Sequence, residues 1–247
     1  MKILVLLSQV PDTTARIAFT NSGTQYDGNG VTFIMNPYDE WYALVRALEL
    51  KEAKGSGSVT TITVGGADTD ATIRKGLAIG ADEAVRIDAQ PADALQVAEL
   101  IAGYAKDKGF DLVLAGKETI DHNSGVVGAM VAELLDMPYV PLASKLDVSG
   151  DTATVERDVP GGVEVLDVKL PFALSAAKGM AEQRIPNMRG IMAARTKPLQ
   201  VVAAGAVSNA ASAVTFELPP AKGAVMMIPP DEAGKLIERL HTEAKVI

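Results

Sequence analysis

The sequence predicts an α/β fold with a doubly wound, mostly parallel sheet, an antiparallel β extension and a C-terminal arm. Three observations lead to this prediction. Strand and helix patterns alternate four times in the first 138 residues, as they do where right-handed crossovers join parallel strands. From Tyr139 the pattern changes to period-two alternation between turns, which is typical of antiparallel strands. From Ala204 the chain is rich in small residues and prolines, so we expect it to pack on another surface.

The parallel part is predicted from four apolar runs, each followed by a helix pattern. Asn36 and Pro37 precede two acidic residues, which is typical of a helix start capped by Asn36. Asp68 is expected to cap the next helix within a tight turn that begins at Gly65. The predicted strands are Lys2 to Leu7, Val59 to Val64, Ala84 to Ile87 and Asp111 to Ala115, and the predicted helices are Pro37 to Ala53, Asp68 to Ala78, Ala92 to Lys106 and Val126 to Leu135.

The antiparallel extension is predicted from three alternating runs with turns at residues 150–151 and 160–162. After them, Phe172 to Ala176 is expected to return as a central strand of the sheet. The arm is expected to end in one helix, from Asp231 to about Ala244. The three alternating runs are Ser144 to Val148, Thr152 to Asp158 and Val163 to Leu170.

Composition excludes several classes of function. The chain has 247 residues, 48% of them hydrophobic, so it can bury a core and is not disordered throughout. Its net charge of −8 argues against a nucleic acid as partner. The absence of cysteine excludes thiolate metal sites and a Cys nucleophile. The N-terminal apolar run Ile3 to Leu7 is too short for a membrane span or a signal peptide, so we expect no membrane insertion and an intracellular protein.

Three loops lie where an open parallel sheet binds ligands, at the carboxyl ends of its strands. They follow Leu7, Val64 and Ala115. The third loop, residues 116–128, enters a helix through Asn, Ser and Gly, which lets the main chain approach a ligand and offers free N–H groups to a phosphate. Asp121 is in a position to hold a ribose hydroxyl. A purely structural role, in which Asn123 or Ser124 caps the helix, explains the same residues equally well.

No catalytic constellation is recognisable. Neither the G-x-G-x-x-G fingerprint after a strand nor the P-loop motif occurs. Gly65 to Asp68 faintly resembles a pyrophosphatase loop, but the leading serine is missing and a tight turn is the simpler interpretation. His122 is expected to be a loop hydrogen-bonder and His241 a solvated residue, and no carboxylate pair indicates acid–base catalysis. We therefore expect a protein without catalytic residues of its own.

Residues 182–198 form the one locally basic stretch of the sequence. It contains four cationic residues and a single acid, Glu182, with two methionines and two isoleucines between the charges. Flexible methionine side chains suit a surface that must fit a partner. By pattern alone, a linker whose Ile and Met side chains pack back on the core is an equal alternative. The cationic residues are Arg184, Arg189, Arg195 and Lys197.

A series of short motifs occurs in a characteristic order along nearly the whole chain. They are Lys2 to Val5, Val10 to Asp12, Met35 to Pro37, Thr72 to Asp82, Asp111 to Lys117, Ile120-Asp121, Val155 to Asp158 with Gly161-Gly162, and, most specifically, Asn187 to Pro198. In this order the motifs resemble the β subunit of electron transfer flavoprotein, in the group that includes the FixA proteins. The resemblance implies a Rossmann-like, adenine-nucleotide-binding fold.

The resemblance also implies a function and partners. Such a subunit pairs with an α subunit in a heterodimer that carries electrons from acyl-CoA dehydrogenases and other dehydrogenases to a quinone oxidoreductase, which connects it with fatty acid β-oxidation. FAD is held mainly by the α subunit, and the β subunit buries an AMP that stabilises the assembly. It also implies a location in the bacterial cytoplasm, or in the mitochondrial matrix if the source is eukaryotic.

By position, the resemblance assigns residues to two sites. Met188 takes the place of an apolar anchor that inserts into a pocket of the dehydrogenase. The AMP site comprises Leu6, Asn36, Pro37, Tyr38, Asp39, Val64, Gly116, Lys117, Glu118, Thr119, Ile120, Asp121, His122, Asn123, Ser124, Gly125, Val126 and Val127. The partner-docking segment comprises Arg184, Ile185, Pro186, Asn187, Met188, Arg189, Gly190, Ile191 and Met192.

Two departures from the family pattern leave alternatives open. The loop from Asp121 matches neither the sequence motif of the AMP-binding members nor that of the bifurcating members, which bind a second FAD and use NADH. AMP is the prediction, and FAD is the alternative suggested by Val127-Gly128. Ala193 and Thr196 stand where lysine is frequent, which leaves the identity of the dehydrogenase open.

The predicted domain organisation follows from these assignments. Residues 1–203 are expected to form the nucleotide-binding domain, including the antiparallel meander at 139–171 and the recognition loop at 182–198. Residues 204–247 are expected to form a spacer and an arm, whose part from Gly223 onward wraps the α subunit.

Overall fold

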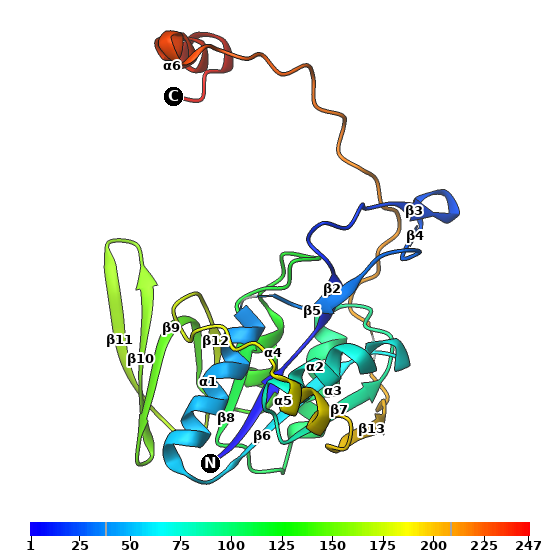
Figure 1. The fold of residues 1–247 in the computed structure, drawn as a ribbon, viewed down its shortest axis with the longest axis vertical. Helices are drawn as coiled ribbons and strands as arrows, with labels where there is room; N and C mark the ends of the chain where they lie inside the picture. Colours follow the sequence, from blue (N-terminus) through cyan, green and yellow to red (C-terminus); the bar gives the residue numbers. More distant parts are fainter. Residues whose placement is uncertain (38, 208) are drawn as a thin grey trace.

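Within the residues that the computed structural model describes, which are 1–37, 39–207 and 209–247, a nine-stranded sheet forms the centre of the molecule (Figure 1). Across the sheet its strands are β11 (Gly162–Lys169), β10 (Thr152–Val159), β9 (Tyr139–Ser149), β12 (Phe172–Ala176), β8 (Leu112–Gly116), β1 (Lys2–Leu6), β6 (Ser58–Val64), β7 (Glu83–Asp88) and β13 (Leu199–Ala203). From β9 to β13 all neighbours pair in parallel, whereas β10 is antiparallel to both β9 and β11. The mostly parallel sheet with an antiparallel extension is confirmed.

Helices cover both faces of the parallel part, so the fold is doubly wound. The helices are α1 (Asp39–Lys54), α2 (Asp70–Ile79), α3 (Ala94–Ala105) and α4 (Val127–Leu134). One buried cluster joins α1 and α2 to the sheet, and a second joins α3 and α4 to its other face. The chain adds β6 and β7 on one side of β1 and then returns to add β8 on the other side. The direction of winding therefore reverses at β1, where sheets of this kind bind ligands.

The first strand shows why the sequence gives apolar runs rather than alternation. Ile3 and Val5 belong to the core under α1 and α2. Leu4 and Leu6 belong to the core on the opposite face. Because both faces of β1 are buried, every position from Ile3 onward is apolar.

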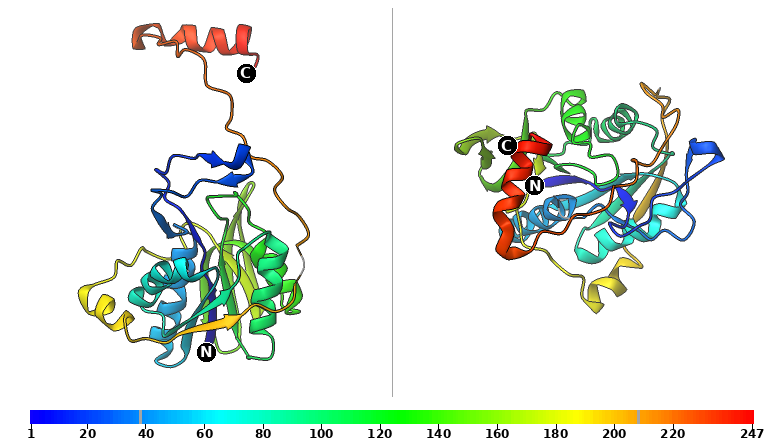
Figure 2. Two further views of the ribbon diagram at one scale, coloured as in Figure 1. Left: turned by 90° about the vertical axis from the view of Figure 1, so that its right-hand side faces the viewer. Right: turned by 90° about the horizontal axis from the view of Figure 1, so that it is seen from above.

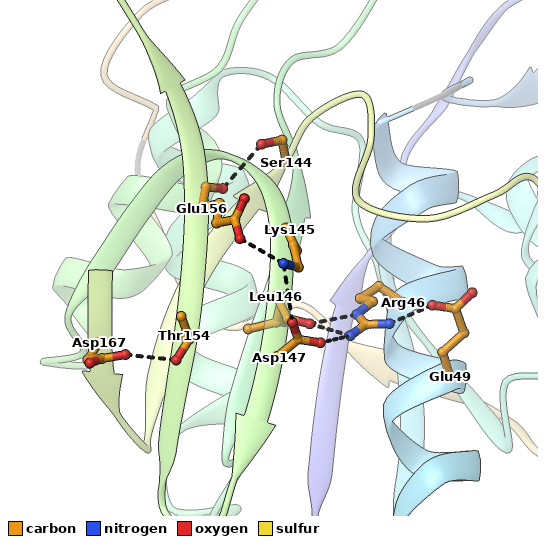
Figure 3. Close-up of polar contacts among 9 residues, drawn as sticks. All are labelled: Arg46, Glu49, Ser144, Lys145, Leu146, Asp147, Thr154, Glu156 and Asp167. Atoms are coloured by element: carbon orange, nitrogen blue, oxygen red, sulfur yellow. Dashed lines mark hydrogen bonds and ion pairs between the residues drawn. The ribbon is translucent and has the colours of Figure 1, made fainter. Parts of the chain in front are cut away.

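A polar contact joins the antiparallel extension to α1 (Figure 3). The Arg46 guanidinium donates to the main-chain oxygen of Leu146 at 2.8 Å and to Asp147 Oδ1 at 2.8 Å. A third contact at 2.8 Å, to Glu49, orients the guanidinium along its own helix. Such a fork of donors fixes the direction of β9 as well as its distance from the helix.

Several local predictions are wrong. Asn36 is not the residue before α1, because the helix begins at Asp39, and its side chain bonds the main chain of a distant loop at Glu118 and Ile120. Asp68 does not cap a helix either. Gly66 precedes the 3₁₀ turn at 67–69 and Thr69 precedes α2, and neither residue makes a side-chain capping bond. The recognition loop predicted at 182–198 contains a helix, α5 (Met188–Ala194), and is followed by β13. Two small antiparallel pairs were also not predicted, β2 (Gln9–Pro11) with β5 (Phe33–Met35) and β3 (Phe19–Thr20) with β4 (Gln25–Tyr26).

The arm leaves the body of the molecule after β13 (Figures 1 and 2). It is exposed along most of its length and ends in α6 (Ala233–Arg239) and a further turn at Leu240–Ala244, which stand away from the sheet. His241 is exposed, as expected. No helix in the described parts of the chain has both the length and the apolar character needed to cross a bilayer.

Candidate functional site

A cavity of about 650 Å³ opens at the carboxyl ends of β1, β6, β7 and β8. Its volume is in the range of small-molecule and cofactor sites. The walls combine apolar side chains with polar loop residues. The apolar part comprises Leu6, Leu7, Phe33, Val64, Val97, Ile101 and Val127, and the polar part includes Ser8, Gln9, Thr69, Gln90, Thr119, Asp121 and Ser124.

The loop that forms one wall, residues 116–128, is fixed from below by a buried side chain. Asn36 is fully buried; its amide donates to the main-chain oxygen of Glu118 at 2.9 Å, and its Oδ1 accepts from Ile120 N–H at 3.1 Å. Across the loop, Thr119 N–H donates to the main-chain oxygen of Ser124 at 3.1 Å. Asn36 therefore acts on the cavity by holding the loop that lines it.

Glycines allow this loop to pack closely. A Cβ on Gly116 would lie 2.7 Å from Glu40 Cγ and 2.9 Å from the Glu40 main-chain nitrogen. A Cβ on Gly125 would lie 2.6 Å from the main-chain oxygen of Lys117. All three distances are shorter than a Cβ tolerates, so the loop requires glycine at both positions.

The start of α4 decides between the two interpretations left open for Asn123 and Ser124. The residue before α4 is Val126, and no side chain caps the helix. The capping interpretation is therefore wrong. Asn123 has a φ of 48° and turns the loop, and Ser124 lines the cavity.

Glu40, at the start of α1, is a buried carboxyl on the cavity wall. Ser8 N–H donates to its Oε2 at 2.7 Å, and the Ser8 hydroxyl hydrogen bonds with Oε1 at 2.6 Å. Burial raises the pKa of Glu40 to about 8 against these hydrogen bonds, and the negative charge of Asp121 adds to the increase. The carboxyl therefore keeps its proton at neutral pH.

The charge of the cavity lining restricts how it can hold an anion. Among the described lining residues there is no lysine or arginine. A phosphate placed here would be held by main-chain N–H groups, helix starts and hydroxyls rather than by cationic side chains. The carboxyl groups on the lining are Glu40, Asp68, Asp93, Glu118 and Asp121.

The structure brings most of the predicted nucleotide-binding residues to one place. Leu6, Val64, Gly116, Glu118, Thr119, Asp121, His122, Ser124, Gly125 and Val127 line the cavity. Pro37, Asp39, Lys117, Ile120, Asn123 and Val126 do not line it, and Asn36 only supports it. Tyr38 lies outside the described residues. His122 makes its loop hydrogen bond through the main chain, to Asp121 Oδ1 at 2.9 Å.

Sequence reasoning missed two parts of the lining. Residues 90–94, between β7 and α3, form a fourth strand-end loop. It was detectable, because Ala84 to Ile87 was predicted as a parallel strand of the same sheet. The second part, Ala211 to Ala213, belongs to the spacer, and its small residues carry no signal of burial.

The predicted docking segment presents apolar side chains to solvent. The exposed fractions of Ile185, Met188 and Met192 are 79%, 74% and 57%. The alternative in which these side chains pack back on the core is therefore wrong. Asn187 caps α5 by accepting a hydrogen bond from Gly190 N–H at 2.8 Å.

The backbone around this segment is attached to α1 and α2. Arg74 of α2 donates to the main-chain oxygens of Ala194 and Lys197, both at 2.7 Å. Lys197 Nζ donates in turn to the main-chain oxygen of Ala81 at 2.6 Å. Arg184 forms two hydrogen bonds with Glu52 at 2.7 and 3.0 Å. Two of the four cationic residues are thus engaged within the chain, whereas Arg189 and Arg195 are exposed.

Comparison with known proteins identifies the family of this chain. The family model of the electron transfer flavoprotein domain matches residues 24–207. The electron transfer flavoprotein subunit beta of Bacillus subtilis is 38% identical over the whole of both chains, and that of Syntrophomonas wolfei is 34% identical over 100% of this chain and 98% of its own. The human subunit is 34% identical over 91% of each chain. The chain belongs to the electron transfer flavoprotein β-subunit family.

Proposed function

We propose that the cavity at the carboxyl edge of the sheet binds AMP, and that this AMP has a structural role. The single observation that carries the proposal is the convergence of strand-end loops on one cavity of nucleotide size at the point where the winding reverses. Apolar walls from Leu6, Val64 and Val127 suit a purine base. The start of α4 supplies N–H groups for a phosphate, and Asp121 is in a position to accept from a ribose hydroxyl.

We propose further that the chain carries out electron transfer together with an α subunit. FAD bound mainly in that subunit supplies the redox chemistry. The residues of this chain bind the nucleotide, position the partner and expose the docking segment, so they need no acid, base or nucleophile. Acyl-CoA dehydrogenases are the proposed donors and a quinone oxidoreductase the proposed acceptor.

The docking segment supports the proposal that dehydrogenases bind to this chain as electron donors. Met188 is a flexible apolar side chain on a helix whose main chain is fixed by Arg74. An exposed anchor on a fixed support concentrates binding energy in few contacts, which permits rapid association and release. The arm from Gly223 to Ile247 is proposed to pack on the α subunit, because it stands away from the body of the molecule and exposes Val225, Met226 and Met227.

A bifurcating subunit that binds a second FAD is the alternative. It was suggested by Val127-Gly128, but packing also explains this glycine. A Cβ on Gly128 would lie 2.9 Å from Ala115 Cβ and 3.2 Å from Tyr139 Oη. Because the contact of α4 with β8 already requires a glycine here, Gly128 does not favour FAD over AMP.

Nucleotide analysis of the purified heterodimer tests the proposal. Acid extraction is expected to release AMP, with one FAD per dimer and no reduction of the flavin by NADH. Two FAD per dimer with NADH-dependent reduction would replace the AMP proposal by the bifurcating alternative. A dimer without any nucleotide in this subunit would contradict both. Absence of ATP turnover would also exclude a nucleotide-hydrolysing enzyme, the function suggested by the faint resemblance of Gly65 to Asp68 to a pyrophosphatase loop.

A further inference from the structure

One wall of the cavity comes from the spacer that follows the last strand of the sheet. Ala211, Ser212 and Ala213 line the cavity beside residues 90–94. We call residues 209–213 the strap. In Figures 1 and 2 this part of the chain, drawn in orange, rises along the β13 side of the sheet toward its carboxyl edge. The strap is far from the strand-end loops in sequence, yet it faces the same space.

Asp93 holds the strap with one carboxylate oxygen and caps α3 with the other. Its Oδ1 accepts from Gln96 N–H at 2.8 Å, which is the N-cap bond of α3. Its Oδ2 accepts from Ala210 N–H at 2.6 Å and from Ala211 N–H at 2.8 Å. These main-chain donors lower the pKa of Asp93, so the carboxylate stays charged at neutral pH. Hydrogen bonds to a charged acceptor are stronger than those between neutral groups.

The strap has little else to hold it. Residues 209–213 are exposed and consist of Asn, Ala and Ser, so burial of apolar surface contributes little. In the described part of the chain, the fixed points on either side of the strap are Val207, which packs against the core under α3 and α4, and Phe216, whose N–H donates to the main-chain oxygen of Gly23 at 2.6 Å and whose ring stacks on Phe19 at 5.3 Å. An exposed segment without such contacts gains conformational entropy by leaving the surface. The two bonds to Asp93 are therefore what keeps the strap over the cavity.

We propose that residues 209–213 close the nucleotide cavity and that Asp93 is the latch that keeps them closed. This inference rests on the proposed function, since it assumes a nucleotide in the cavity. It assigns a binding-site role to two regions, the start of α3 and the spacer, that lie outside the predicted site residues. Because the strap continues into the arm, the latch also connects retention of the nucleotide with the segment proposed to pack on the α subunit.

Two variants separate the latch from the helix cap. Asp93→Ser keeps a side-chain oxygen that caps α3 well but has no second oxygen to reach the strap. Ala211→Pro leaves Asp93 intact and removes one of the two N–H donors. Ala221→Pro, in the exposed spacer and outside the strap, is the matched control for a new proline.

The measurement is the rate at which bound nucleotide leaves the purified heterodimer, followed by chase with labelled AMP. With Asp93→Ser we expect release about tenfold faster, in keeping with the loss of two charge-assisted hydrogen bonds. We expect a smaller increase with Ala211→Pro, no change with Ala221→Pro, and unchanged melting temperatures for all three. Release at the wild-type rate in both latch variants would overturn the latch and leave the AMP site standing. A wild-type dimer that retains no nucleotide would overturn the AMP site, and the latch with it.

Discussion

The cavity loop at residues 116–128 and the docking segment at residues 184–192 are both fixed through their main chains, yet they present opposite surfaces. The cavity loop is held by the buried Asn36 side chain and encloses a space. The docking segment runs into α5, whose last residue, Ala194, is held by a hydrogen bond from Arg74, and it exposes Met188 to solvent. The first arrangement suits a small ligand that must be retained, and the second suits a large partner that must leave quickly.

This difference indicates which properties of the protein an amino-acid substitution in each region would alter. In the cavity loop, Gly116 and Gly125 leave no room for a Cβ and the Asn36 side chain holds the main chain, so a substitution at these positions alters the loop, the ligand and the stability together. In the docking segment, the exposed side chains contribute nothing to the core, so a substitution is expected to alter only association. Four predictions test this contrast, beginning with the largest expected effect.

The largest effect is expected from Glu40, which burial makes an acid with a pKa of about 8. Between the unfolded-state pKa near 4.5 and about 8, the folded state binds a proton that the unfolded state has lost. Stability is therefore greatest below that window, and it falls as the pH rises through about 8, by several kcal/mol in total. Urea unfolding across this pH range measures the effect.

Glu40→Gln is the matched control, because a neutral amide reproduces the shape of the protonated acid. It is expected to flatten this part of the pH dependence, while Glu52→Gln, at an exposed position of the same helix, leaves it in place. An unchanged pH profile in Glu40→Gln would show that Glu40 titrates normally.

Gly116→Ala is expected to lower the free energy of unfolding by about 3 kcal/mol and to reduce the nucleotide content. The added methyl group would meet the main chain at the start of α1, which cannot move without displacing Glu40. Thermal melts and nucleotide extraction measure both effects. Gly103→Ala is the matched control, because a Cβ at this position of α3 meets open space and alanine favours a helix. Equal stability of the two variants would contradict close packing at Gly116.

Asn36→Ala is expected to lower the free energy of unfolding by about 2 kcal/mol, since it leaves a partly buried N–H and a partly buried oxygen of the cavity loop without their partner. Affinity for the nucleotide falls as well, because the loop is no longer held. Chemical denaturation and AMP titration measure the two quantities. Asn29→Ala, at an exposed turn, is the control and is expected to change neither.

Met188→Ala is expected to have the smallest effect, confined to the docking half of the comparison. The rate of flavin reduction by the dehydrogenase at low concentration falls about tenfold, as for loss of one apolar anchor. Stability and nucleotide content stay at wild-type values, because the side chain is exposed. Val165→Ala, exposed on β11, is the control. Wild-type reduction rates in Met188→Ala would show that the anchor lies elsewhere.

Sequence patterns were sufficient for the parallel sheet because its strands are buried on both faces. The run from Ile3 to Leu6 is apolar at every position for that reason. Patterns failed where an element has little burial of its own. β13 is an edge strand whose residues Gln200, Val201 and Ala203 are exposed, and α5 has Ala194 as its one buried residue. Neither carries the apolar spacing that predicts a strand or a helix.

The candidate site was predictable in part for a different reason. Strand ends locate a cavity, so the loops after Val64 and Ala115 were identified from topology, and Val64 and Gly116 line the cavity. Asn36 was misread as a helix cap, because its partners Glu118 and Ile120 are distant in sequence. The same holds for Asp93, whose bonds to Ala210 and Ala211 link two regions that no local pattern connects.

Hydrogen exchange of the heterodimer, with the nucleotide bound and after its removal, tests the central claim most directly. The account predicts that bound AMP slows exchange of main-chain amides in residues 64–69 and 116–128. It predicts no change in residues 184–194, whose helix lies outside the cavity. Protection confined to residues 184–194, or exchange that is the same with and without AMP, would contradict it.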